Sequence, residues 1–387
     1  MYGSEGGVML DPFVGSGTTL AEAKLYGMKS IGFDLNPLAL LISKLKSHQF
    51  SHEELDNYLL LLKGLIPKAK PQTFKKSATY LNLSSDVAIT WYTKRTLREL
   101  AMLLRLIKSQ DQNMLQDLGL IVIGQLLRRM SFQRPREAKK YRKEGWQDFS
   151  GENTYVPVIP KFYERLDYVI QSMKDYADHL PRNPVESKCF LFDSSSSNEY
   201  PESLEVIDLV ITSPPYGDSP TTVAYEQQSW FANNGLGLDT RPDSALAREM
   251  LGGGKNVEPV QSFGYRTIDS ILNQMPKETR IKNSKFLNEY YSSICNVSKR
   301  VVNNGVVCYI VGNRSWRGSG GKRLRLDLFT RWAFERNGFR LIGKIIERDV
   351  INKSQPSMSS NDGKSEGSGE VGESMNKEYI VRLRKVC

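Results

Sequence analysis

Two short motifs bring together residue types that can bind a charged ligand and a planar one. The first is Asp11-Pro-Phe-Val-Gly-Ser-Gly-Thr-Thr19, an acid and a glycine-rich turn after the apolar run Gly7–Leu10. The second is Ser213-Pro-Pro-Tyr216, after the apolar run Val206–Ile211. Glycines let a ligand approach the backbone closely, and two prolines hold their neighbours in a rigid, extended turn. The motifs are therefore candidates for a cofactor site and an acceptor site.

The glycine turn is compatible with few ligands. A phosphate-binding loop carries a lysine near its second glycine, and none is present here. A dinucleotide fingerprint has a third glycine where Leu20 stands. S-adenosylmethionine has no phosphate but carries a sulfonium cation, which an acid such as Asp11 would stabilise. Asp34, at the end of the next predicted strand, would accept the ribose hydroxyls, and Asp193, after a later strand, the adenine amine. The alternative is a tight turn that binds no ligand.

The Ser-Pro-Pro-Tyr motif predicts a pocket for a base taken out of its stack. The Ser213 hydroxyl and the Pro214 carbonyl can both accept hydrogen bonds from an NH₂ group, and Tyr216 offers a ring for stacking. Two acceptors on the amine would support the positive charge that develops when a methyl group is transferred to it. The chain has no Pro-Cys dipeptide, which argues against methylation of a cytosine carbon. Alone, the motif could equally be a stiff surface turn or a polyproline ligand.

The motif pair resembles motifs I and IV of the DNA amino-methyltransferases, which are common in bacterial restriction–modification systems. The resemblance implies S-adenosylmethionine as cofactor, no metal, and double-stranded DNA as partner. The cofactor contacts that we predict are Asp11, Phe13, Gly15, Ser16, Gly17, Thr18, Asp34 and Asp193. The base contacts that we predict are Ser213, Pro214, Pro215 and Tyr216.

The first residue of motif IV bears on the target base. In these families serine mostly accompanies methylation of the cytosine amine, whereas aspartate or asparagine usually accompanies adenine. We therefore expect transfer to N4 of cytosine, with N6 of adenine and an RNA base as alternatives. Related enzymes also carry a segment before motif I, whereas ten residues precede Asp11 here. A truncated start, or a separate polypeptide that supplies this part and without which the chain is inactive, is a further expectation.

The elements that position these motifs alternate between strands and helices. A strand before Asp11, a helix from Thr18, which can cap it, to Tyr26, and a strand over Lys29–Asp34 predict a βαβ unit. With the resemblance, the fold class is α/β, a doubly wound, mostly parallel sheet of the class I methyltransferase type with a large helical insertion.

We expect four kinds of region along the chain. The catalytic core would span 1–45 and 185–387, with the cofactor half in 1–45 and the target-base half from 185. Residues 46–184 would form a helical insertion that is a candidate for DNA contact. Residues 217–286, rich in Gly, Asn and Pro, would form irregular loops that are candidates for target recognition. Residues 352–377 would form a flexible loop.

The net charge of +10 favours polyanionic partners. Basic residues cluster among Phe132, Tyr141 and Trp146, a mixture suited to phosphate neutralisation and stacking. The candidates for DNA binding are Arg128, Arg129, Arg134, Arg136, Lys139 and Lys140. A solvated helix end is the alternative.

Other features narrow the class of protein. No apolar run approaches the roughly 18 residues of a membrane span, and the N-terminus lacks the pattern of a signal peptide. The four cysteines are scattered, and the three histidines match no metal motif. We expect a cytoplasmic, nucleoid-associated bacterial protein without a membrane partner.

Overall fold

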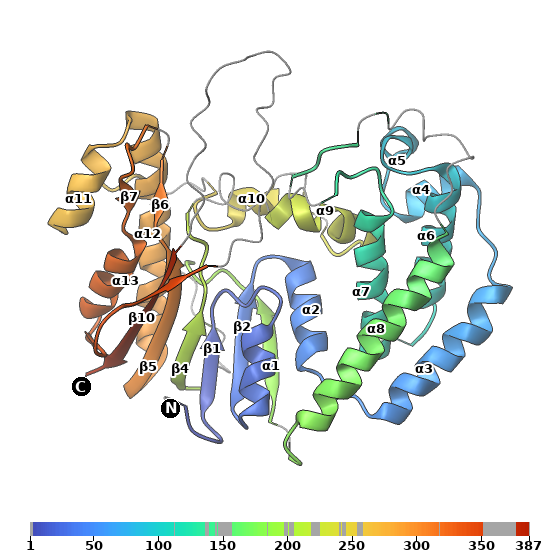
Figure 1. Cartoon of the computed structure of the whole chain (residues 1–387), viewed down its shortest axis with the longest axis horizontal. Coiled ribbons are helices and arrows are strands. Elements are labelled where there is room, and N and C mark those ends of the chain that lie inside the picture. Colours follow the sequence, from blue (N-terminus) through green and yellow to red (C-terminus); the bar gives the residue numbers. More distant parts are fainter. Residues whose placement is uncertain are drawn as a thin grey trace. The chain divides into compact units, whose positions relative to one another are not determined.

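A computed structural model shows two compact units (Figure 1). The structure describes residues 3–111, 113–135, 139–143, 145, 157–183, 185–196, 200, 205–217, 225–239, 241, 245–253, 258–316, 318–350 and 377–386. Unit 1 comprises Met1–Phe13, Asp193–Thr222 and Arg248–Cys387, and unit 2 comprises Val14–Phe192 and Val223–Ala247.

Unit 1 is built on a mixed sheet. Its central strands are β1 (Val8–Asp11), β4 (Ile207–Thr212) and β5 (Val301–Gly312), and neighbouring strands in this order run parallel. The strand β10 (Lys377–Lys385) pairs antiparallel with β5, β8 (Phe339–Leu341) and β9 (Ile346–Asp349). All four residues of β1 and most of β4 are buried, as expected for the continuous apolar runs that form parallel strands. The parallel pairing places the carboxyl ends of β1 and β4 side by side.

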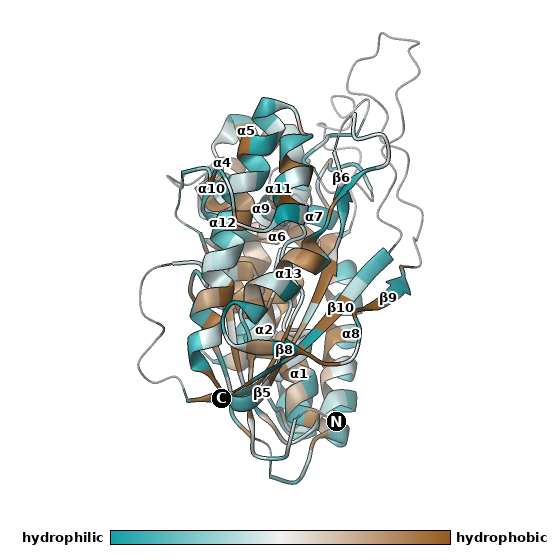
Figure 2. Cartoon of the chain, turned by 90° about the vertical axis from the view of Figure 1, so that its left-hand side faces the viewer, coloured by the Kyte–Doolittle hydropathy of each residue, from teal (hydrophilic) through white to brown (hydrophobic). Residues whose placement is uncertain are grey.

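Helices cover this sheet and complete unit 1. The helix α13 (Leu326–Glu335) packs against β5, β8 and β10, and α12 (Lys277–Arg300) packs against α13. Figure 2 shows hydrophobic residues along α13 and part of β10, whereas β9 is mostly hydrophilic. The smaller elements are α10 (Ala245–Glu249), α11 (Arg266–Asn273) and the paired strands β6 (Arg314–Ser315) and β7 (Arg323–Leu324).

Unit 2 joins a parallel strand pair to a group of helices. The strand β2 (Lys29–Asp34) pairs with β3 (Ser187–Leu191), and α1 (Thr18–Leu25) and α2 (Pro37–Ser47) accompany them. The remaining helices are α3 (His52–Leu65), η1 (Ile66–Lys68), α4 (Phe74–Tyr80), α5 (Ser85–Trp91), α6 (Lys94–Lys108), α7 (Met114–Arg129), α8 (Val158–His179) and α9 (Tyr225–Leu236).

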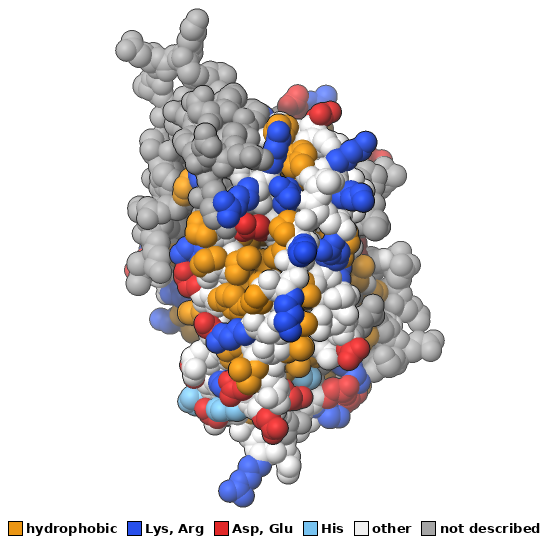
Figure 3. Space-filling view, turned by 90° about the vertical axis from the view of Figure 1, so that its right-hand side faces the viewer, with side chains coloured by type: hydrophobic (Ala, Val, Ile, Leu, Met, Phe, Trp, Pro, Cys, Tyr) orange, Lys and Arg blue, Asp and Glu red, His pale blue; other side chains and the backbone are white. Residues whose placement is uncertain are grey.

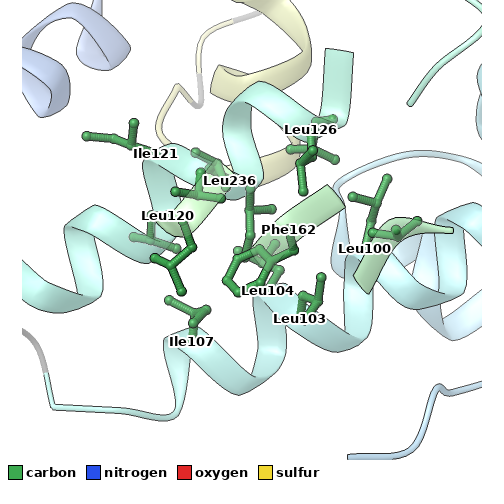
Figure 4. Packing of buried hydrophobic residues seen from close by; sticks show 14 of the residues in the cluster. Leu100, Leu103, Leu104, Ile107, Leu120, Ile121, Leu126, Phe162 and Leu236 are labelled. Carbon is green, nitrogen blue, oxygen red and sulfur yellow. The ribbon is translucent and has the colours of Figure 1, made fainter. Parts of the chain in front are cut away.

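These helices share one apolar core. On α6 the buried leucines and isoleucine recur at the spacing of one helix face, at Leu100, Leu103, Leu104 and Ile107. Figure 4 shows them packed with Phe162 of α8 and with residues of α7 and α9. Leu45 and Phe50 belong to the same cluster, so the core continues from the cofactor half into the helices. The contacts therefore group 14–45 with the helical region, a different division from the one predicted at residue 46.

The prediction of irregular loops over 217–286 is wrong where α9, α10, α11 and the first residues of α12 lie. Glycine and asparagine in α9 suggested a loop, but Gly235 serves a close helix contact. A Cβ on Gly235 would lie 2.7 Å from Leu127 Cδ1 of α7. Within the predicted loop 352–377, residues 352–376 lie outside the described residues, and Lys377 begins β10.

Candidate functional site: a glycine turn and a Ser-Pro-Pro-Tyr edge

The glycine turn before α1 has a backbone that only glycine adopts readily. Gly15 and Gly17 have φ angles of 51° and 75°, in the left-handed region. A Cβ on Gly17 would lie 2.6 Å from Ser43 Cα of α2, and the Ser43 hydroxyl donates a hydrogen bond of 2.9 Å to the Gly15 carbonyl. The turn is therefore held closely against α2. Gly17, not Thr18, caps α1, and the exposed Thr18 hydroxyl accepts from Lys46 Nζ instead.

Asp34, at the end of β2, supports the same turn. Its Oδ2 accepts from the Gly15 amide at 2.9 Å, and its Oδ1 accepts from the Asn36 amide at 2.8 Å. Burial raises the pKa of the Asp34 carboxyl, and the backbone donors act in the opposite direction. The Leu35 amide is a third backbone donor to this carboxyl, and a carboxylate has about four lone-pair positions for hydrogen bonds. Asp34 can therefore shape the turn and still accept from a ribose hydroxyl.

A segment that the sequence did not single out packs beside Asp34. The buried Asn233 of α9 donates from Nδ2 to Asn36 Oδ1 at 2.9 Å, and Arg241 donates to the Leu35 carbonyl at 3.0 Å. Arg241 also forms a two-point ion pair with Asp239. The residues after motif IV thus contribute to the surroundings of the predicted ribose acid. No local pattern distinguishes these polar residues from those of a surface helix.

Asp11 connects the two motifs within unit 1. Its side chain is 3% exposed, and Oδ1 accepts from the Phe13 amide at 3.0 Å and from Thr212 Oγ1 at 2.6 Å. Thr212 is the last residue of β4 and directly precedes Ser213. The start of motif I is therefore joined by a buried hydrogen bond to the residue that leads into motif IV. The predicted contact of Asp11 with a sulfonium stays a prediction.

Motif IV lies at the carboxyl end of β4. Ser213 is exposed, Pro214 is buried, and Pro215 and Tyr216 are half-buried. The Tyr216 hydroxyl donates to Glu378 Oε1 at 2.9 Å and lies 2.9 Å from Ser213 Oγ. Arg348 in turn donates to Glu378 Oε2 from Nε and Nη2, at 3.0 and 2.6 Å. The sequence could not indicate Glu378 or Arg348, which lie more than 130 residues after Tyr216.

The other predicted cofactor residues lie in or near turns. Ser16 is exposed, and Phe13 is half-buried. Asp193 Oδ1 accepts from both the amide and the hydroxyl of Ser195, at 3.0 and 2.7 Å. Asp193 is thus engaged in a local turn after β3, and its predicted contact with adenine is untested.

The basic cluster forms a hairpin in unit 2, which we call the basic hairpin (residues 132–135 and 139–143). Gln133 and Arg142 form a β-bridge, and the Arg134 amide donates to the Tyr141 carbonyl. Lys140 Nζ lies 4.2 Å from the centre of the Trp230 ring, and the Arg142 guanidinium lies 5.5 Å from that of Trp91.

The predicted role of Phe132 in stacking on DNA is not supported, because this ring is 7% exposed. Trp91 and Trp230 instead lie under the cations, with ring centroids 6.3 Å apart. Arg128 donates to the Gln228 carbonyl, and Arg129 is exposed. Arg136 and Trp146 lie outside the described residues.

The described residues contain neither a metal-binding cluster nor a helix that could span a membrane. No group of three His, Cys, Asp or Glu side chains there is arranged to hold a metal ion. Nor does any helix in the described ranges have the length and apolar character needed to cross a membrane. His48 packs edge-on against Phe50, and burial lowers its pKa.

Fold and site together define a class of protein. An α/β chain that presents a glycine turn with acids and a Ser-Pro-Pro-Tyr turn at the ends of parallel strands has the features of an amino-methyltransferase core. Comparison with known proteins agrees. The N6_N4_Mtase family model, described as DNA methylase, matches residues 1–44.

Curated relatives carry the comparison further along the chain. The type II methyltransferase M.MvaI of Kocuria varians is 25% identical over 326 residues, which cover 79% of this chain and 70% of that protein. The type II methyltransferase M.BsoBI of Geobacillus stearothermophilus is 27% identical over 237 residues, which cover 55% of this chain and 44% of that protein. The chain thus spans less than half of the length of M.BsoBI.

The family model and these relatives support the resemblance to the DNA amino-methyltransferases that the two motifs predicted. Among solved structures, an rRNA methyltransferase, AviRa of Streptomyces viridochromogenes, aligns with 99% of this chain and 78% of its own at 10% identity. Its TM-score of 0.30 is too low to support any argument.

Proposed function

We propose that this chain transfers a methyl group from S-adenosylmethionine to N4 of a cytosine flipped out of double-stranded DNA, as the modifying enzyme of a restriction–modification system. One observation supports this most. The buried hydrogen bond from Thr212 to Asp11 joins the ends of β1 and β4, so the residues that begin the cofactor motif and the base motif share one sheet edge. Ligands of open α/β sheets bind at this edge.

The turn fits the proposed cofactor. Gly15 and Gly17 hold the turn in left-handed conformations and add no side chain to it, and Asp34 keeps acceptor capacity beside Gly15. These residues, with Phe13, Ser16 and Thr18, would hold S-adenosylmethionine, which supplies an activated methyl group when bound. Asp193 is proposed as the acceptor of its adenine amine.

The chemistry at motif IV follows from the weak nucleophilicity of a base amine, whose lone pair is delocalised into the ring. Ser213 Oγ and the Pro214 carbonyl would accept from the two N–H groups and draw the nitrogen toward tetrahedral geometry. Bound S-adenosylmethionine would supply the methyl group, whose bond to nitrogen would form as its bond to sulfur breaks and leaves the electron pair on sulfur. The positive nitrogen afterwards loses one proton to solvent. The two acceptors stabilise the charge as it develops.

The target base is decided by a nucleoside digest. Duplex DNA of mixed sequence is incubated with the protein and methyl-labelled donor, digested, and separated by chromatography. We expect label in N4-methyldeoxycytidine. Label in N6-methyldeoxyadenosine would replace cytosine by adenine, and label only in an RNA substrate would refute DNA as the acceptor. The Ser213→Ala variant is the control. It lacks one of the two proposed acceptors for the base amine, so it should incorporate less label.

We further propose that the basic hairpin contacts the DNA backbone. Arg142 and Lys143 are exposed, and the neighbouring Trp91 and Trp230 rings are half-buried. Figure 3 shows Lys and Arg side chains around a central group of hydrophobic ones on one face of the molecule, so charge alone does not single out a site. What favours the hairpin is the combination of cations with two tryptophan rings, since stacking and phosphate neutralisation act together in DNA binding.

A further inference from the structure

A chain of polar side chains in unit 1 ends at Ser213. Arg348 of β9 forms a two-point contact with Glu378 Oε2, and Glu378 Oε1 accepts from the Tyr216 hydroxyl at 2.9 Å. The Tyr216 oxygen lies 2.9 Å from Ser213 Oγ. The Glu378 side chain is 14% exposed and that of Arg348 is 57% exposed, so the carboxylate is the sheltered member of this pair.

The Glu378 carboxylate and the Arg348 guanidinium determine which group donates in each hydrogen bond of this series. An ionised carboxylate only accepts hydrogen bonds, and a guanidinium only donates. Because the single hydroxyl proton of Tyr216 is directed to Glu378, the Tyr216 oxygen can only accept from Ser213. Ser213 therefore uses its proton inward, and both lone pairs of its exposed oxygen are available to a donor outside the protein.

We propose that Glu378 is a positioning residue that fixes Ser213 as a hydrogen-bond acceptor for the amine of the target base. The inference rests on the proposed function, because it assigns a polarity to the base site. If each hydrogen bond in this series had the opposite donor, the Ser213 proton would point outward toward the amine hydrogens. The Glu378 carboxylate excludes that arrangement, because it cannot donate to Tyr216.

Glu378→Gln reverses this polarity without changing the size of the side chain. Arg348 requires an acceptor, so the glutamine oxygen turns toward it and the amide NH₂ toward Tyr216. The Tyr216 hydroxyl then donates to Ser213, whose proton points outward. Loss of one hydrogen bond to a developing charge predicts single-turnover methyl transfer roughly tenfold to a hundredfold slower, with the dissociation constants of DNA and donor changed less than about twofold.

The hairpin of β9 and β10 offers a matched control. Glu347 pairs with Lys377 on the same two strands, and both side chains are exposed. Glu347→Gln removes a charge from the same hairpin without touching Tyr216, and its transfer rate should equal that of the wild type. A slowing equal to that of Glu378→Gln would mean that the hairpin, not the polarity of Ser213, is responsible.

Two double variants separate polarity from simple support. In Tyr216→Phe the hydroxyl is absent, so adding Glu378→Gln should slow transfer no further. In the Glu378→Gln variant, adding Arg348→Ala frees the amide to turn its oxygen toward Tyr216, and part of the rate should return. Additive losses in both pairs would overturn the proposal.

A measurement that needs no activity tests the hydrogen bond itself. In protein labelled with ¹³Cζ-tyrosine, the Tyr216 resonance is assigned from its loss in Tyr216→Phe. It should shift in Glu378→Gln and not in Glu347→Gln. If wild-type protein methylates no DNA while this shift appears, the proposed function fails and the contact stands. If wild type is active and Glu378→Gln is equally fast, the polarity role is refuted alone.

Discussion

Replacement of Gly17 by alanine tests whether the cofactor turn is held as tightly as its geometry indicates. Gly17 has a φ of 75°, and an added Cβ would lie 2.6 Å from Ser43 Cα and 2.8 Å from Ser43 Cβ. The nearest obstacle is backbone, which a rotamer change cannot move. The variant therefore combines an unfavourable φ with a steric overlap against α2.

The two effects have separable magnitudes. A left-handed conformation costs a residue with a Cβ about 1–2 kcal/mol. Forcing an extra methyl group into a packed contact costs typically about 1–3 kcal/mol more. Gly17→Ala should thus lower the free energy of unfolding by roughly 2–5 kcal/mol. Since relief of the overlap would move the turn away from Ser43, we also expect weaker binding of S-adenosylmethionine.

Gly237, in the same unit, is the matched control. Its φ is 71°, but the atoms nearest to an added Cβ are the ends of two side chains, Asn82 Nδ2 at 3.2 Å and Lys108 Nζ at 3.8 Å. Gly237→Ala should lower the free energy of unfolding only by the cost of the left-handed φ angle. Urea unfolding followed by circular dichroism gives both free energies, and calorimetric titration gives the donor affinity. Equal destabilisation by the two variants would refute the close approach of the turn to α2.

Three further changes test other parts of the site. Thr212→Val removes the hydrogen-bond donor to the buried Asp11 carboxylate and should lower the free energy of unfolding in urea by about 1.5–3 kcal/mol. The control Thr330→Val removes a buried hydroxyl whose partners are neutral and should lower it by about 0.5–1.5 kcal/mol. Equal losses in the two variants would contradict a charged partner of Thr212. Burial raises the pKa of Asp34, so the folded protein binds a proton at this carboxyl more tightly than the unfolded chain does. Asp34 therefore stabilises the fold most below pH 3.8, its ordinary pKa, and less as the pH rises through the raised pKa. Asp34→Asn should remove this decline in stability with rising pH. Parallel curves of unfolding free energy against pH from 3.5 to 7 for variant and wild type would contradict a raised pKa at Asp34. Arg142→Ala should weaken DNA binding and reduce the slope of log affinity against log salt concentration by roughly one. The control Lys161→Ala, on α8, should leave this slope unchanged. Fluorescence anisotropy titrations with DNA at several salt concentrations measure the slope for each variant.

Local chemistry made the turns of the site predictable. The two glycines in left-handed conformations and the two prolines after β4 are requirements of single positions, so their types can be read without knowledge of distant residues. The strand before each motif was recognisable because a buried parallel strand is a continuous apolar run. The structure pairs these two strands in parallel, so that their ends meet at one edge.

Helix α9 could not be predicted in this way. Its asparagines and glycines resemble a loop, but Gly235 allows close packing on α7 and Asn233 bonds to Asn36. Composition is ambiguous here because small and polar residues serve loops and tight helix contacts equally. Only the position of the partner residue distinguishes them.

The aromatic partners of the basic cluster show the same limit. Sequence proximity suggested Phe132, which lies in the core, whereas Trp91 and Trp230 come from two helices distant in the chain. Stacking depends on proximity in space, and each tryptophan alone carries no sign of the cation above it.

By itself the sequence determined the family resemblance and the two turns that carry it, because these follow from backbone conformations and functional groups that neighbouring residues impose. The tertiary structure alone decided what surrounds them. It buried Asp11 against Thr212 and brought Glu378 and Arg348 to Tyr216, across 162 residues in the case of Glu378. Hydrogen bonds over such separations form because strands far apart in the chain become neighbours in a sheet, and no periodicity or local spacing records that pairing.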